Sequence, residues 1–118
     1  MELTPGANTY NTAEELKAYA VKAGIDISID EETALSRSID YVESLNFSGS
    51  KTNPDQTLEF PRNGNEFVPG SIKKSQLVIA GIIGSQDGFQ GMGENYIDYP
   101  EVAKLLKPFI AEESQVEE

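Results

Sequence analysis

The stretch 70-GSIKKSQLVIAGII-83 decides how the remainder can fold, and it ends in the most apolar run of the sequence, Leu77–Ile83. Pro69 precedes it and suits the first turn of a helix, so we predict a helix over residues 70–83. Apolar side chains cover this helix almost all round, which is typical of a helix at the centre of a bundle or beneath a neighbouring subunit. Its face and flanks comprise Ile72, Gln76, Leu77, Val78, Ile79, Ala80, Ile82 and Ile83. A bilayer span needs roughly 20 apolar residues, so we expect no membrane contact from this shorter run.

Upstream, a capping pattern predicts an amphipathic helix from about Ala13 to Ala23. Thr12 and Glu15 have the spacing of a capping box, and Gly24 can adopt the left-handed conformation that ends a helix. The apolar stripe of this helix comprises Leu16, Tyr19, Ala20 and Ala23.

A second helix is predicted to begin after Asp30, which can cap it, and to run to about Asn46. Its buried stripe comprises Leu35, Ile39, Val42 and Leu45. The side chains expected to face solvent are those of Arg37, Asp40 and Glu43. The preceding segment, residues 25–29, alternates like a strand, but so short a segment before a capped helix favours an extended connector.

Downstream, Pro100 can begin a last helix, predicted from Glu101 to about Glu113. Pro108 lies inside it and removes one backbone hydrogen bond, so we expect a kink or break near residues 104–107. The acidic residues that follow are expected to fray.

Two stretches lack a helical pattern and are predicted to be loops. Residues 47–71 are rich in Gly, Ser, Asn and Pro, and Leu58 and Phe60 could pin them to the core. Loops longer than about 15 residues in a compact domain are usually functional or mobile, so this one is a candidate contact surface. Residues 84–99 are glycine-rich and are predicted to form a flexible loop.

These patterns together predict one mostly α domain over residues 1–118. It should be a small bundle of about four helices, with long irregular loops at about 47–71 and 84–99 and an acidic C-terminal helix and tail at 100–118. With 38% apolar and 25% charged residues, the composition is that of a folded domain.

The net charge and two missing residue types argue against several classes of function. The 20 acidic and 9 basic residues give a net charge of -11, a field that repels phosphate backbones and anionic lipids. Cys and His are absent, which removes the commonest general base, the commonest transition-metal ligands and the usual nucleophile pairs. Residues 88–93 lack the Lys of a phosphate loop, and the acidic cluster at residues 26–32 lacks EF-hand spacing. We therefore expect no enzymatic activity, catalytic residue, cofactor or metal.

Several segments follow the pattern of a known family. They are Thr9–Thr12, Leu16–Ala20, Ala34–Val42, Phe47–Lys51, Pro54–Gly64, Val68–Pro69 and Ile72–Lys73. On these residues the chain resembles a tailed-bacteriophage family often labelled DnaT-like single-stranded-DNA-binding protein, whose members look like adaptor subunits of the head-to-tail connector in the phage neck. The chain departs from that pattern at Phe60, where Trp is common.

The resemblance implies a subunit of a dodecameric ring between portal and tail, which extends the DNA channel. Its implied partners are further copies of the chain, the portal protein, a tail-side stopper or tail-terminator protein, and genomic DNA that passes without specific binding. An acidic channel wall would let DNA slide because it repels phosphates. The implied location is the virion neck, after synthesis in the host bacterial cytoplasm, and residues 1–6 show no signal-peptide pattern.

Two contact surfaces are expected. The apolar face of the last helix suits docking into a groove on the portal, through Leu105, Leu106, Phe109 and Ile110. Deleting residues 100–118 should then leave the subunit folded. The long loop, through Phe60, Pro61 and Arg62, should meet a neighbouring subunit or the next ring. Arg62 could instead pair within its own chain, and the sequence favours neither alternative.

The alternative function is a single-stranded-DNA-binding accessory protein of phage replication. The basic residues are scattered, with only Lys73 and Lys74 adjacent, so the sequence shows no positive groove for a DNA strand. A regulatory module for a host protein also remains open.

Overall fold

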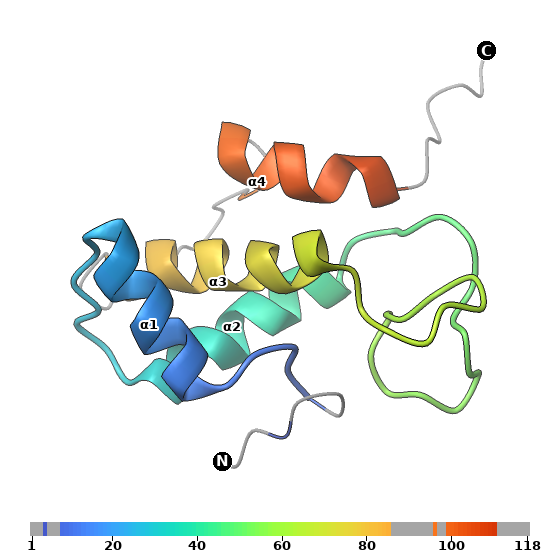
Figure 1. Cartoon of the computed structure of the whole chain (residues 1–118), viewed down its shortest axis with the longest axis horizontal. Coiled ribbons are helices and arrows are strands. Elements are labelled where there is room, and N and C mark those ends of the chain that lie inside the picture. The colour runs from blue at the N-terminus through green and yellow to red at the C-terminus, as the bar shows by residue number, and fades with distance from the viewer. Residues whose placement is uncertain (1–3, 5–7, 86–95, 97–98, 111–118) are drawn as a thin grey trace.

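The computed structural model describes residues 4, 8–85, 96 and 99–110, and these form a helical protein (Figure 1). The elements are α1 (Ala13–Ala23), α2 (Glu31–Glu43), α3 (Gly70–Ser85), α4 (Pro100–Leu106) and a short 3-10 helix, η2 (Lys107–Phe109). The described ranges contain no strand, and isolated β-bridges pair Phe47 with Ile110 and Lys51 with Arg62. The predicted mostly α class with about four helices and long irregular loops is confirmed.

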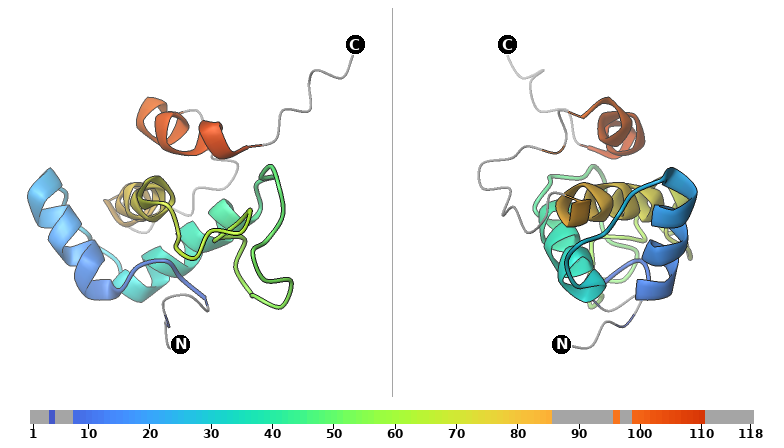
Figure 2. Two further views of the ribbon diagram at one scale, coloured as in Figure 1. Left: turned by 45° about the vertical axis from the view of Figure 1, so that its right-hand side comes forward. Right: turned by 90° about the vertical axis from the view of Figure 1, so that its left-hand side faces the viewer.

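Helix α3 is the central element. It lies between α4 on one side and α1 and α2 on the other (Figures 1 and 2). Ile72 and Ile79 are fully buried, and so are polar Ser75 and Gln76 on the same helix. The prediction of a central helix is therefore confirmed. Among the described helices, none combines the length and the apolarity that a bilayer span requires.

The connector between α1 and α2 packs directly on the second half of α3. A Cβ atom at Gly84 would lie 2.9 Å from Ile27 Cγ2, so the close approach requires glycine. Ser28 donates to the Gly84 carbonyl from both its N–H, at 3.1 Å, and its hydroxyl, at 2.9 Å. The connector forms no strand, as predicted.

Helix starts follow the predicted caps, whereas the ends of α2, α3 and α4 differ from expectation, and α3 runs to Ser85 instead of Ile83. Thr12 and Glu15 form the capping box of α1, Gly24 ends it in the left-handed conformation, and the Asp30 carboxylate caps α2. Helix α2 ends at Glu43 instead of Asn46 because the next amides bond three residues back, which tightens the last turn.

The last helix is much shorter than predicted. Helix α4 ends at Leu106, η2 continues to Phe109, and Ile110 is extended. Pro108 cannot donate a hydrogen bond into the helix, which explains the break. The prediction of a helix to about Glu113 is wrong for residues 107–110, and the rest of it lies outside the described residues. The expected break itself is confirmed.

A buried polar cluster holds the N-terminal segment on α3. The Gln76 side-chain oxygen accepts from Tyr10 N at 3.0 Å and from Asn11 Nδ2 at 2.9 Å. Its Nε2 donates to Thr9 Oγ1 at 2.8 Å and to the Leu35 carbonyl of α2 at 3.2 Å. One side chain thereby ties the N-terminal segment, α2 and α3 together, and we call this group the Gln76 clamp.

Replacing Gln76 by Met should destabilise the fold by about 2–4 kcal/mol, because a similar volume remains while buried partners lose their hydrogen bonds. Urea unfolding monitored by circular dichroism measures the change. The matched control is Lys17→Met on the exposed face of α1, which should alter the free energy of unfolding by less than about 0.5 kcal/mol. Equal effects of the two substitutions would contradict a structural role for the clamp.

Candidate functional site

The segment between α2 and α3 is the candidate site. Residues 47–69, here called the Arg62 loop, extend beyond one end of the helices without forming a helix or strand of their own (Figure 1). They link Glu43 at the end of α2 to Gly70 at the start of α3 through residues 44–46. A segment of this length keeps one conformation only if its backbone groups find specific partners.

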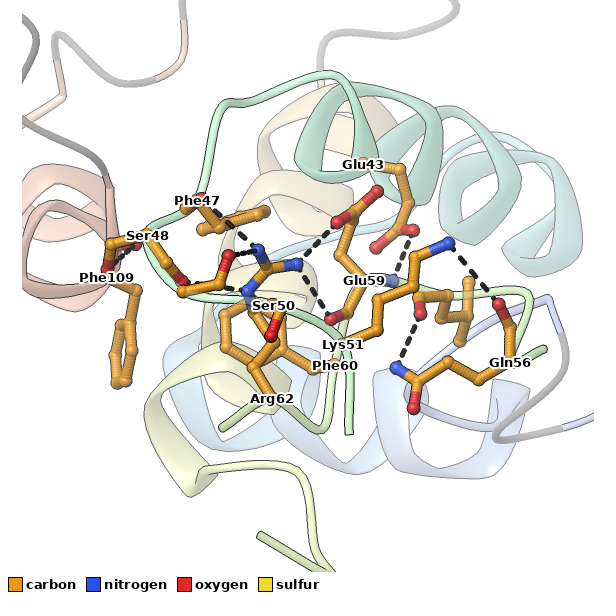
Figure 3. A network of polar contacts seen from close by, with 12 residues as sticks. Glu43, Phe47, Ser48, Ser50, Lys51, Gln56, Glu59, Phe60, Arg62 and Phe109 are labelled. Carbon is orange, nitrogen blue, oxygen red and sulfur yellow. Dashed lines mark hydrogen bonds and ion pairs between the residues drawn. The ribbon is translucent and has the colours of Figure 1, made fainter. Parts of the chain in front are cut away.

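Arg62 supplies most of those partners (Figure 3). Its Nε donates to the Ser48 carbonyl at 2.9 Å, and its Nη2 donates to the carbonyls of Phe47 at 3.3 Å and Gly49 at 2.7 Å. Its Nη1 donates to the Glu59 carbonyl at 3.2 Å and to Glu59 Oε1 at 2.6 Å. A guanidinium carries five N–H groups, so every donor of Arg62 is used inside the loop.

Backbone hydrogen bonds also join the two arms of the loop, which are the stretches before and after its tip. The Asn63 amide donates to the Ser50 carbonyl at 2.8 Å, and the Thr52 amide donates to the Pro61 carbonyl at 3.0 Å. Gly49 has a φ of 81°, and a Cβ atom there would overlap the Asn63 side chain. The arms therefore meet in an arrangement that needs glycine at this position.

Gln56 braces the tip of the loop. Its Nε2 donates to the carbonyls of Leu58 at 2.7 Å and Pro61 at 2.9 Å, and its Oε1 accepts from the Asn53 amide at 3.0 Å. Lys51 Nζ donates to the Gln56 carbonyl at 3.3 Å. The tip is therefore tied to the arm that carries Arg62.

Phe60 anchors the loop to the core. Its ring packs edge to face against Phe47, Phe109 and Tyr10, with centroid separations of 4.7, 5.6 and 6.5 Å. The Arg62 guanidinium carbon lies 5.9 Å from the centroid of the Phe60 ring. Phe60 is 4% exposed, and the peptide bond to Pro61 is cis. The loop, the N-terminal segment and η2 therefore share one aromatic cluster.

A carboxylate on α2 completes the attachment. Glu43 accepts from the Tyr10 hydroxyl at 2.6 Å and from the Glu59 amide at 2.8 Å, and the Tyr10 hydroxyl accepts from the Phe60 amide at 3.1 Å. Burial raises the pKa of Glu43 above its ordinary value of 4.5, although both hydrogen bonds oppose that rise. Burial and then the Glu43 carboxylate raise the pKa of Tyr10, so the phenol keeps its proton as a donor. The expectation that Glu43 faces solvent is wrong, because its carboxylate binds the N-terminal segment and the loop.

The outer rim of the Arg62 loop is exposed and mostly uncharged. It comprises residues 48–50, 52–55, 57 and 63–67. Asp55 and Glu66 are the charged side chains among these rim positions, and Phe67 is 79% exposed. Beneath this rim lie the buried anchors Phe47, Leu58, Phe60 and Arg62. The loop thus presents a polar surface over an ordered base.

The predicted contact residues of the loop lie at its base and not on its rim. Arg62 is 8% exposed and its donors are all taken, so the alternative that it pairs within its own chain is correct. Phe60 is buried in the core and Pro61 is half-buried. These side chains shape the surface that a partner would meet, and the rim residues form it. Sequence gave no signal for the rim beyond its Gly, Ser and Asn content.

The predicted docking residues near the C-terminus are also used inside the chain. Leu106 is fully buried in the core, and Leu105, Phe109 and Ile110 are half-buried against it. They do not form one removable helical face, because the helix ends between them. Removing residues 100–118 would take Val102 and Leu106 out of the core, so the expectation that such a deletion leaves the fold intact is not supported by this packing.

The remaining candidates fall mostly outside the described ranges. Residues 86–95 and 97–98, which include the glycine-rich loop, and the acidic residues 111–118 are not among the described residues. Within the described ranges, no group of three or more carboxylates is arranged to hold a metal ion.

Arg62→Lys should destabilise the protein by about 2–4 kcal/mol, because an ammonium has three donors and cannot span carbonyls on both arms of the loop. Urea unfolding measures the stability, and limited proteolysis should cut the variant faster within residues 47–69. The control is Lys51→Gln, which removes a positive charge and one long hydrogen bond from the same loop and should change stability by less than about 1 kcal/mol. Wild-type stability and protease resistance in Arg62→Lys would show that the loop does not depend on the guanidinium.

Comparison with known proteins gives one match. The chain matches, over residues 2–102, the model of the family described as "Putative DnaT-like ssDNA binding protein". No curated protein and no solved structure matches the chain. The matched range contains the Gln76 clamp, the Arg62 loop and the start of α4. Since the match covers most of the sequence, the chain belongs to the DnaT-like family.

Proposed function

We propose that the protein is a structural subunit of the neck of a tailed phage, which forms an oligomeric ring between portal and tail and extends the DNA channel. The resemblance of residues 8–83 to neck adaptors suggests this role. The observation that carries the proposal is the Arg62 loop, whose base is built from satisfied hydrogen bonds while its rim stays open.

A preformed rim suits assembly with other proteins. Binding costs less conformational entropy when the contacting segment is already ordered. Uncharged polar side chains at such a surface can exchange water for a partner's hydrogen bonds without burying unpaired charge. The rim of the Arg62 loop consists mostly of uncharged side chains, although the chain as a whole carries a net charge of -11.

The surplus negative charge fits a subunit beside moving DNA. A negative channel wall repels phosphates, so the genome can pass without being held. Mutual repulsion also opposes association of free subunits, which favours assembly on a portal template. The proposal includes a dodecameric ring in the virion neck, portal and tail-side neck proteins as partners, and no catalytic activity.

Mixing the purified chain with its cognate portal rings tests the proposal. We expect stoichiometric binding in sedimentation and an added ring under the portal in electron micrographs. Asp55→Arg on the rim should reduce formation of the added ring at least tenfold, whereas Glu14→Arg, the same charge change on α1, should not; both side chains are exposed. No binding to the portal between low and physiological salt would contradict the proposal, and so would equal effects of the two variants.

The family description favours a second candidate function, binding of single-stranded DNA. Fluorescence anisotropy with a labelled oligonucleotide separates the two, because electrostatic binding must weaken steeply as salt rises. Saturable binding with such a salt slope would support the second function. Absence of binding even at low salt would remove it.

A further inference from the structure

Phe67 is the large apolar side chain on the otherwise polar rim of the Arg62 loop. Its side chain is 79% exposed, while Phe47 and Phe60 of the same loop are buried. The other large apolar side chain exposed among the described residues is Val21 on α1, at 82%. Single exposed apolar side chains are common on protein surfaces, so Phe67 indicates an interface only together with a surface that can receive it.

A groove between α3 and α4 offers a place for such a ring. One hollow of about 400 Å³ is lined by Tyr19, Ile25, Val78, Ile82, Tyr99, Pro100 and Glu101. A second hollow of about 470 Å³ is lined by Lys74, Pro100, Glu101, Lys104 and Leu105. The two hollows adjoin each other at Pro100 and Glu101, and together they are called here the α3–α4 groove.

We infer that Phe67 of one subunit inserts into the α3–α4 groove of a neighbouring copy, and that this contact joins successive subunits of the ring. The inference rests on the proposed function, since it names the partner of a surface that a ring requires. The tyrosine and aliphatic walls of the first hollow match an aromatic side chain, and its volume exceeds the roughly 300 Å³ at which ligand pockets begin.

The charge beside Phe67 is opposite in sign to charges at the α3–α4 groove. Glu66 precedes Phe67 and is exposed, and Lys74 and Lys104 line the second hollow. With Phe67 in the apolar hollow, the adjacent carboxylate can approach one of these ammonium groups. The groove also contains Glu101, which leaves its lining with one net positive charge in a strongly acidic chain. A copy of the same chain is thus a chemically suitable occupant.

The positions of Phe67 and of the apolar hollow on the subunit favour a ring. Phe67 precedes α3, whereas the apolar hollow reaches Ile82 on the second half of that helix. Gly70 and Ile82 are about 18 Å apart along the helix axis, at 1.5 Å per residue. Phe67 does not fill its own groove, because it is exposed. A contact between two different surfaces of identical subunits runs head to tail, and head-to-tail contacts generate rings when they close.

Disulfide trapping tests the contact, because the natural sequence has no cysteine. One chain carries Glu66→Cys beside an intact Phe67, and a second, mass-tagged chain carries Glu101→Cys at the groove. Mixing two single-cysteine chains excludes a disulfide within one chain. We expect the mixed dimer to form under mild oxidation, with a higher yield on portal rings, since a disulfide needs Cα atoms within about 7 Å.

Two controls decide the result. Val21→Cys, equally exposed on α1, should give at least tenfold less mixed dimer with Glu101→Cys. Adding Phe67→Ser to the Glu66→Cys chain should reduce the yield by a similar factor, and its circular dichroism should stay unchanged because the replaced ring is exposed. A yield equal to the Val21 control, or one that Phe67→Ser does not alter, would overturn the inference.

The outcome is separable from that of the proposed function. Portal binding without the mixed dimer would refute the Phe67 contact alone. If Phe67→Ser abolished portal binding while no mixed dimer formed, Phe67 would serve the portal and the inference would be wrong. The mixed dimer without portal binding would refute the neck role and leave a self-associating protein.

Discussion

The hydrogen bonding of the Arg62 guanidinium is the constraint on which the rest of the candidate surface depends. Its five donors bind carbonyls on both arms of the loop and the Glu59 carboxylate, so a long segment without helix or strand acquires a fixed base. Burying a cation is unfavourable unless it is paired and fully hydrogen-bonded, and here both conditions hold. The rim can then remain polar and exposed without losing its shape.

The helical part of the protein positions this base. The Gln76 clamp fixes the N-terminal segment against α2 and α3, which places Tyr10 where its hydroxyl meets Glu43 and the Phe60 amide. The bridge between Phe47 and Ile110 brings the C-terminal end of the described chain to the same cluster. The loop is therefore continuous with the core, and a change in either should be felt in the other.

Sequence reasoning succeeded where the signal is local. The capping box at Thr12 and Glu15, the Asp30 cap and the break at Pro108 depend on neighbouring residues, and all are present. Predictions are wrong or undecided where the partner is distant in sequence. Helical periodicity predicts Glu43 toward solvent and does not decide the partner of Arg62, because it does not show that Tyr10 or the Ser48 carbonyl lies within hydrogen-bonding distance. The exposed position of Phe67 likewise depends on the loop's three-dimensional path.

The central claim is that the Arg62 loop is ordered in the free subunit, before any partner binds. Amide hydrogen exchange followed by nuclear magnetic resonance tests this directly. The amides of Thr52, Glu59 and Asn63 donate hydrogen bonds within the loop or to α2, so we predict exchange at least about 100-fold slower than in an unfolded chain. Exchange of these amides at unfolded-chain rates, while the amides of α3 stay protected, would contradict the account.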